Sequence, residues 1–279
     1  MTRYARPSTL DEAVHLLAQG GGTLLAGGTD FYPGLGDRPA SGNIVDLSRV
    51  LEMKGVTATE DEIRIGGLTT WSELLASSLP RCYDGLKSAA REIGGVQIQN
   101  RGTVAGNLCN ASPAADSVPP LLALDAEVEL RSLAGSRRMA LAEFIMGNRK
   151  TRRQRDEILT AVIVPRGMDQ ARSVFLKLGA RRYLVISIVM VAALVKVNGG
   201  VVEKARIAVG ACSARAQRLT ALEQELAGAA AEPGMGKAVR AEHLAPLSPI
   251  DDVRATATYR RDAALTLVAR ALDACVGKG

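Results

Sequence analysis

A stretch of sixteen residues in the middle of the chain, RGTVAGNLCNASPAAD from Arg101 to Asp116, contains almost nothing large enough to build a hydrophobic core. Runs this rich in small residues form turns between core elements, or lie where another molecule approaches the main chain. Cores must come from elsewhere, and 47% of the 279 residues are hydrophobic but only 3% aromatic, so those cores are aliphatic. The bare stretch therefore calls for an explanation other than side-chain packing.

A second glycine-rich stretch, LLAGGTDF from Leu24 to Phe31, has the same character. An apolar run enters the pair Gly27-Gly28, and adjacent glycines let successive N–H groups face one way, which suits a phosphate. A tight turn between a strand and a helix explains the pair equally well. The chain has neither the GxxxxGK loop of nucleotide triphosphatases nor a GxGxxG motif in a βαβ setting. Two bare turns in two lobes would grip a diphosphate from both sides.

The periodicities predict an α+β protein of several lobes, because the chain exceeds a usual domain of about 100–150 residues. A helix capped by Ser8 and short strands at Thr23–Ala26 and Asn43–Leu47 form a small first unit. A hairpin is expected around Asn198-Gly199-Gly200, and a helical pattern follows it. The predicted divisions are a first lobe at 1–55, a second lobe at 56–168 and a C-terminal domain at 171–279.

The net charge of +6 arises from 35 Lys and Arg against 29 Asp and Glu, and much of the excess lies in the loop Asn148–Arg155. Such a loop is either merely solvated or contacts a partner or nucleotide. Nucleic acid is the weakest alternative, because the loop carries no aromatic side chain for base stacking.

The sequence offers no first shell for a metal ion, because its four cysteines form no CxxC pair and its two histidines, His15 and His243, are far apart. The first residues contain no apolar run typical of a signal peptide. The most apolar segment, Tyr183–Val195, is shorter than the roughly 20 residues of a membrane-spanning helix. We therefore expect a cytoplasmic protein with no membrane span.

Three segments in this order resemble one known family: LLAGGTDF, then QIQNRGTVAGNLCNASPAADSVPPLLALDAEVEL, then FLKLGARRYLVISIVMVAAL. The chain resembles the FAD-binding medium subunit of molybdenum hydroxylases, the family of xanthine dehydrogenase and carbon monoxide dehydrogenase. The resemblance covers nearly the whole chain. It implies a two-lobed FAD-binding domain of the PCMH (vanillyl-alcohol oxidase-like) type, followed by a C-terminal domain with a small antiparallel sheet and helices.

The resemblance also implies which residues bind FAD. The first glycine stretch wraps the diphosphate, the second grips it from the other side, and the carboxylate of Asp116 hydrogen-bonds the cofactor. Ile93 and Leu159 match apolar positions beside it, and Lys177 matches a basic residue near the flavin. The full set of predicted cofactor contacts is Leu24, Leu25, Ala26, Gly27, Gly28, Thr29, Asp30, Phe31, Ile93, Thr103, Val104, Ala105, Gly106, Asn107, Asp116, Leu159 and Lys177.

Two positions depart from the family pattern. Ala105 stands where the family usually has the first glycine of Gly-Gly-Asn, and its methyl group is tolerable unless the backbone requires positive φ. Val185 stands where many members carry an acidic residue, and its absence would alter the flavin potential or the choice of acceptor.

The function implied by the resemblance is electron transfer, with no catalytic or metal-binding residue in this chain. A large partner subunit would hold the molybdenum cofactor, a small one two 2Fe–2S clusters, and FAD here would pass electrons to NAD, oxygen, a quinone or a protein. The complex is expected to be a dimer of heterotrimers. The alternatives are a stand-alone FAD-dependent oxidoreductase of the same fold and a basic, non-enzymatic binding protein.

Overall fold

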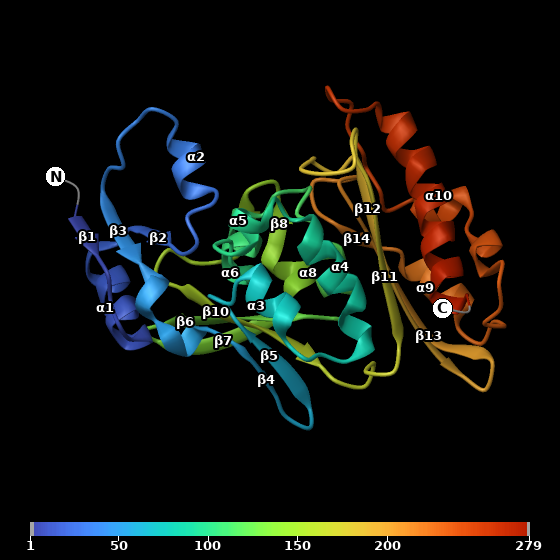
Figure 1. Ribbon diagram of the computed structural model, residues 1–279, viewed down its shortest axis with the longest axis horizontal. Coiled ribbons are helices and arrows are strands. Elements are labelled where there is room, and N and C mark those ends of the chain that lie inside the picture. The colour runs from blue at the N-terminus through green and yellow to red at the C-terminus, as the bar shows by residue number, and fades with distance from the viewer. Residues whose placement is uncertain (1–2, 278–279) are drawn as a thin grey trace. The chain divides into compact units, whose positions relative to one another are not determined.

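The structure, a computed structural model, describes residues 3–277. The outermost residues of the predicted ranges 1–55 and 171–279 lie outside the described part. Figure 1 shows the elements in chain order. The α-helices are α1 (Leu10–Gly20), α2 (Phe31–Leu35), α3 (Trp71–Ala76), α4 (Asp84–Glu92), α5 (Val96–Gln99), α6 (Val104–Asn110), α7 (Val118–Ala123), α8 (Leu141–Phe144), α9 (Thr220–Leu226) and α10 (Ala257–Val276).

The strands form four sheets of two to five strands each. They are β1 (Arg3–Ala5), β2 (Thr23–Leu25), β3 (Asn43–Asp46), β4 (Val56–Ala58), β5 (Glu62–Gly66), β6 (Glu127–Ser132), β7 (Gly135–Ala140), β8 (Ile145–Gly147), β9 (Lys150–Thr151), β10 (Ile158–Pro165), β11 (Arg172–Leu178), β12 (Val189–Asn198), β13 (Val201–Gly210) and β14 (Gln217–Arg218). Short 3₁₀ turns connect several of them.

The chain folds into two compact units that interleave along the sequence. The first comprises residues 1–77, 96–111 and 126–165, and the second comprises 78–95, 112–125 and 166–279. The predicted divisions at 1–55, 56–168 and 171–279 run consecutively and stay a prediction. The first unit nevertheless contains two separate main sheets, one built before residue 47 and one after residue 55.

In the first unit, a parallel sheet of order β1-β3-β2 carries α1, and an antiparallel sheet of order β4-β5-β10-β6-β7 lies further along the chain. Helix α1 buries Ala13, Val14 and Leu17 in a core that also includes Leu68 and Ile158 from the later segments. The predicted Ser8 cap is wrong. Thr9 accepts the N–H of Glu12 in a reciprocal capping box, and Ser8 instead donates to the Glu12 carboxylate.

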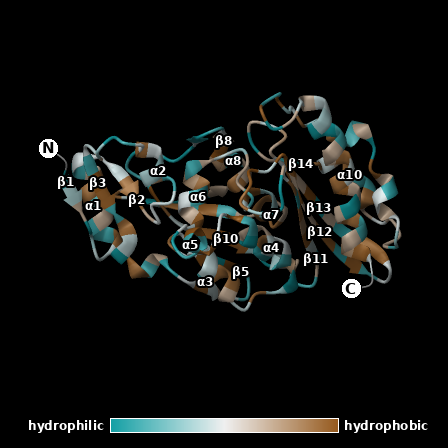
Figure 2. Cartoon of the chain, turned by 45° about the horizontal axis from the view of Figure 1, so that its top comes forward, coloured by the Kyte–Doolittle hydropathy of each residue, from teal (hydrophilic) through white to brown (hydrophobic). Residues whose placement is uncertain are grey.

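In the second unit, the antiparallel sheet β11-β12-β13-β14 is covered on both faces. Alternate residues of β12, such as Val189 and Val191, belong to the core beneath α9 and α10, whereas Met190 faces the side of Pro119 in α7. Because both faces are buried, β12 is apolar almost throughout, as its colours in Figure 2 show. The predicted hairpin is confirmed, with Asn198 paired to Val201.

The predicted α+β class and the C-terminal antiparallel sheet with helices are confirmed. Several short elements had no sequence signal, including the edge strand β7 and the hairpin β8–β9. Seven of the sixteen residues of the bare stretch Arg101–Asp116 are helical, in α6 (Val104–Asn110), and α7 begins after the stretch, at Val118.

Candidate cofactor site

The structure brings the two glycine-rich stretches into contact within the first unit. A β-carbon added to Gly27 would lie 1.9 Å from the carbonyl oxygen of Arg101, and one added to Gly102 would lie 3.5 Å from Oγ1 of Thr29. The loop after β2 therefore rests directly on the backbone that precedes α6, and any side chain at position 27 would push the two segments apart.

The backbone N–H groups of this loop are not used by the protein. Among residues 3–277, the amides of Gly27, Gly28, Thr29 and Asp30 donate no hydrogen bond. Gly28 has φ +77, and Ala26 to Thr29 are half-buried. Consecutive amides without acceptors, next to glycines that admit a bulky group, are the donor set that an anion requires. The residues present therefore fit a phosphate-bearing cofactor.

The second stretch does not have the unused amides expected of a turn that grips a diphosphate. The amides of Val104 and Ala105 donate to the carbonyls of Thr69 and Gly67 at 3.0 and 2.9 Å. The amide of Gly106 donates to Oγ1 of Thr103, which caps α6, and that of Asn107 donates to the Thr103 carbonyl. This segment therefore supports the loop at Gly27 and offers an anion no unused amide between residues 104 and 107.

Ala105 lies inside α6, with helical backbone, and is 7% exposed. Its methyl group packs near Gly67, where an added β-carbon would lie 3.1 Å from it and 2.5 Å from the carbonyl of Leu159. The structure thus accommodates the departure at Ala105 without backbone strain, and it brings predicted residues Ala105 and Leu159 close together around Gly67.

The remaining predicted residues Ile93, Asp116 and Lys177 belong to the second unit. Asp116 is 6% exposed, and its two carboxylate oxygens accept hydrogen bonds from Lys177 Nζ and Ser187 Oγ, both at 2.6 Å. Burial raises the pKa of Asp116, and the two donors counteract part of that rise. Ile93 ends α4, whose Glu92 lies within electrostatic range of Asp116. Asp116 therefore orients the Lys177 ammonium, and each of its oxygens keeps a lone pair for a further donor.

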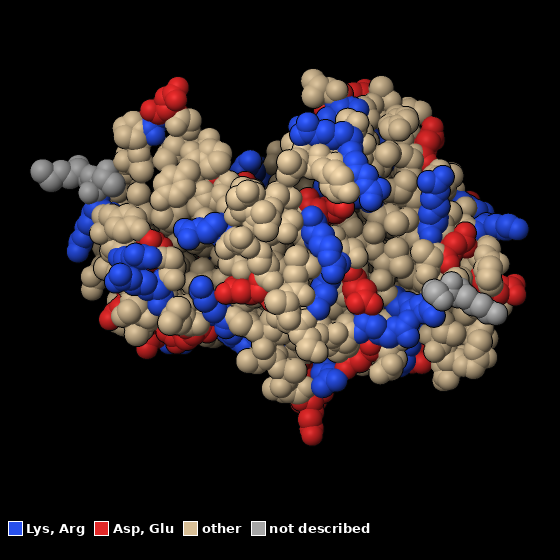
Figure 3. All heavy atoms as spheres, viewed as in Figure 1, with Lys and Arg blue, Asp and Glu red and all other residues tan. Residues whose placement is uncertain are grey.

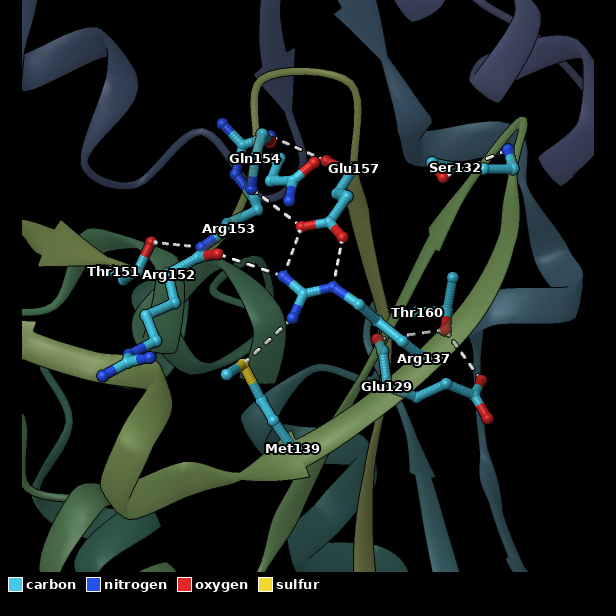
Figure 4. A network of polar contacts seen from close by, with 11 residues as sticks. Glu129, Ser132, Arg137, Met139, Thr151, Arg152, Arg153, Gln154, Glu157 and Thr160 are labelled. Atoms are coloured by element: carbon cyan, nitrogen blue, oxygen red, sulfur yellow. Dashed lines mark hydrogen bonds and ion pairs between the residues drawn. The ribbon is translucent and has the colours of Figure 1, made fainter.

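The basic loop at Asn148–Arg155 is not simply solvated. Figure 4 shows the guanidinium of Arg137 facing the carboxylate of Glu157, with bonds of 2.5 and 2.9 Å. Arg137 also donates to the carbonyl of Arg152, and the amide of Gln154 donates to Glu157. The side chain of Arg153 turns back onto the Glu157 carbonyl at 2.7 Å. The loop is thus folded around one buried carboxylate.

Charges of both signs are interspersed on the face drawn in Figure 3. Within residues 3–277 no group of three or more His, Cys, Asp or Glu side chains is placed to hold a metal ion. In the same part of the chain, none of the helices has the length and apolar character needed to cross a bilayer.

Sequence reasoning missed the residues that tie these segments together. Ser187 lies in the apolar run Tyr183–Val195, where its hydroxyl is a signal of a buried hydrogen bond. Asn110 lies in the bare stretch and Arg149 in the basic loop, and their contact joins segments 39 residues apart, which no local pattern reveals.

Comparisons with known proteins agree with the resemblance. The family described as the FAD binding domain in molybdopterin dehydrogenase matches residues 1–167, and the carbon monoxide dehydrogenase flavoprotein C-terminal domain matches residues 175–275. The chain is 32% identical over 280 residues to a xanthine dehydrogenase FAD-binding subunit of Escherichia coli O157:H7, covering 98% of this chain and 95% of that protein. It is 36% identical over 203 residues to the nicotinate dehydrogenase FAD-subunit of Eubacterium barkeri, covering 70% of this chain and 69% of that one.

Solved structures give the same result. A carbon monoxide dehydrogenase from Hydrogenophaga pseudoflava, in a form that lacks the Mo-pyranopterin moiety of the molybdenum cofactor, contains a chain with 29% identity. The TM-score is 0.90, with 98% of this chain and 96% of that chain covered. Reconstituted carbon monoxide dehydrogenase from Oligotropha carboxidovorans gives a TM-score of 0.91 at 25% identity, covering 100% and 99% of the two chains.

The buried carboxylate at the basic loop yields a pH-dependent prediction. Burial alone would raise the pKa of Glu157, but the hydrogen bonds from Arg137 and Gln154 outweigh it and hold the pKa below the usual 4.5. The ion pair therefore stabilises the fold fully above about pH 4.5, and that contribution is lost as the pH falls through the lower folded-state pKa.

Glu157→Gln should lower the free energy of unfolding by about 2 kcal/mol at pH 7, because it leaves Arg137 without its carboxylate. The difference from wild type should shrink as the pH falls below 4.5. Urea unfolding at both pH values measures it, with Glu60→Gln at an exposed site as the control. Equal costs for the two variants, or a difference independent of pH, would show that the pair is not stabilising.

Proposed function

Because this chain belongs to the FAD-binding subunits of the molybdenum hydroxylase family, that of the xanthine and carbon monoxide dehydrogenases, we propose that it carries FAD as the electron-transfer subunit of a multi-subunit oxidoreductase. One observation carries the proposal: four consecutive amides, Gly27 to Asp30, have no acceptor within residues 3–277, in the segment that the FAD-binding family matches. A diphosphate supplies the missing acceptors.

The loop Gly27–Asp30 would hold the diphosphate by these amides, which lie fixed on the backbone at Arg101. The segment Thr103–Asn107 would contribute the surface of Gly106 and the side chain of Asn107, since the amides of residues 104 to 107 are already bonded. Leu24, Leu25 and Ala26 would position the loop through β2 and its core, and Phe31 continues it into α2.

FAD, when bound, supplies the capacity to take up and release electrons, whereas the protein supplies binding, orientation and electrostatics. In the second unit, Lys177 would present its ammonium toward the cofactor. The carboxylate of Asp116 would fix the position of that ammonium through their hydrogen bond. Its positive charge would favour an anionic reduced flavin. Ile93 and Leu159 would contribute apolar contacts.

The relatives are named as a FAD-binding subunit, a FAD-subunit and a medium chain, and these names support a complex. We propose a large partner with the molybdenum cofactor and a small partner with two 2Fe–2S clusters, assembled as a dimer of heterotrimers in the cytoplasm. Electrons would enter from the clusters and leave to NAD, oxygen, a quinone or a protein.

Gly106→Asp should abolish most FAD retention, because it places a negative charge beside the proposed diphosphate. An added β-carbon there would meet only Oγ1 of Thr103, at 2.8 Å, so the fold should survive a local adjustment. The measurement is the flavin absorbance per chain after purification, with Ala58→Asp on the exposed strand β4 as a control of equal charge. Full FAD content in Gly106→Asp would refute this placement of the diphosphate.

Native purification tests the proposed complex. We expect two further subunits, molybdenum, iron and a flavin spectrum in one particle, recorded by mass spectrometry and metal analysis. A flavin-bearing chain that purifies alone and turns over an organic substrate would instead establish a stand-alone oxidoreductase. A chain without flavin would support the basic binding protein.

A further inference from the structure

Three polar residues, of which Asp30 and Arg149 are exposed and Asn110 is half-buried, join the glycine loop to two other segments of the first unit. Nδ2 of Asn110, at the end of α6, donates to Oδ1 of Asp30 at 2.9 Å. The guanidinium of Arg149, in the turn between β8 and β9, donates through Nη1 to Oδ1 of the same Asn110. The three side chains thus form a chain of hydrogen bonds, which we call the relay. The relay has a negative group, Asp30, at one end and a positive group, Arg149, at the other.

Asp30 does not serve its local helix. It occupies the N-cap position of α2, where aspartate ordinarily accepts a backbone N–H, yet its side chain makes no capping bond. The five-residue α2 buries none of its residues and lies at the end of the loop. The contact with Asn110 therefore takes the place of a local stabilising bond and ties this otherwise weakly packed segment to α6.

The backbone on the other side of the relay is strained. Arg149 and Ala111 have φ of +55 and +48, two of the five non-glycine residues with positive φ between residues 3 and 277. They are bonded to each other, since the Arg149 amide donates to the Ala111 carbonyl at 2.9 Å. Two neighbouring residues keep such unfavourable φ values only where the surrounding contacts hold the backbone in place, and such residues are frequent at functional sites.

Asn110 suits its place for a chemical reason. Its amide presents a donor to a carboxylate and an acceptor to a guanidinium, so both halves are satisfied in one orientation only. A carboxylate here would repel Asp30, and an apolar side chain would break both bonds. The position therefore requires an amide, which marks the relay as a specific arrangement.

We propose that Asp30, Asn110 and Arg149 form a latch that holds the loop Gly27–Asp30 in its cofactor-binding position, with Arg149 as the positioning residue. The latch rests on the proposed FAD function. The Asp30 carboxylate then acts through the loop, while the Asp30 amide remains one of the four donors to the diphosphate. This division is consistent with the repulsion that the carboxylate would meet from a diphosphate. Loss of the latch's hydrogen bonds does not change the four amides of Gly27 to Asp30 themselves, but it allows them to move apart.

The test exchanges the two ends of the Asp30–Asn110 hydrogen bond. Asn110→Asp alone places two carboxylates in contact and should raise the rate of FAD dissociation from the full-length chain about tenfold or more. Adding Asp30→Asn restores a donor facing an acceptor, with Arg149 still bonded, and should return the rate to within about threefold of wild type. Direct contact between the Asp30 carboxylate and the cofactor predicts no such rescue.

A second pair of variants isolates Arg149. Arg149→Met should accelerate FAD dissociation several-fold. Arg155→Met removes the same charge from an exposed arginine of the same loop and should leave the rate unchanged. Thermal unfolding of the FAD-free proteins, equal for all variants, separates the latch from a general loss of stability.

The outcomes distinguish the latch from the function on which it rests. A double variant that releases FAD as fast as Asn110→Asp, or Arg149→Met that behaves as Arg155→Met, overturns the latch alone. If Asn110→Asp does not fold, the comparison of the two methionine variants decides. A wild-type chain that retains no FAD overturns the proposed function and the latch together.

Discussion

The contact between Gly27 and the carbonyl of Arg101 sets the geometry of the candidate site. That carbonyl is held by its neighbours, because Gly102 donates its amide to Ile98 and accepts the amide of Trp71. The loop after β2 can reach it only without a side chain at position 27. Gly27 is therefore required by the protein itself, and the result of its close approach is a run of amides that turn away from any internal acceptor.

The two glycine-rich stretches have different tasks. The first exposes unpaired donors, and the second consumes its own in capping α6 and in bonding Gly67 and Thr69. One stretch thus offers free donors, and the other supports it. In the second unit, Asp116 also supports a neighbouring group, because its carboxylate accepts hydrogen bonds from Lys177 and Ser187.

Much of this organisation could be predicted from the sequence because it is local. The Asn198-Gly199-Gly200 hairpin, the apolar strand β12 and the glycine loop each depend on neighbouring residues. The sequence predicts that Thr103–Asn107 binds phosphate, but it does not show that the amides of this segment donate to the carbonyls of residues 67 and 69. The relay through Asn110 and the buried Glu157 depend on contacts between distant segments, for which periodicity carries no signal.

The central claim is that the amides of Gly27 to Asp30 hold the diphosphate. Amide hydrogen exchange with and without FAD tests it most directly, because these four groups have no acceptor among residues 3–277 and should exchange fast in the FAD-free protein. Binding of FAD should slow their exchange strongly, while the amides of Val104 and Ala105, already bonded, change little. Unchanged exchange at Gly27–Asp30 in the FAD-loaded chain would contradict the claim.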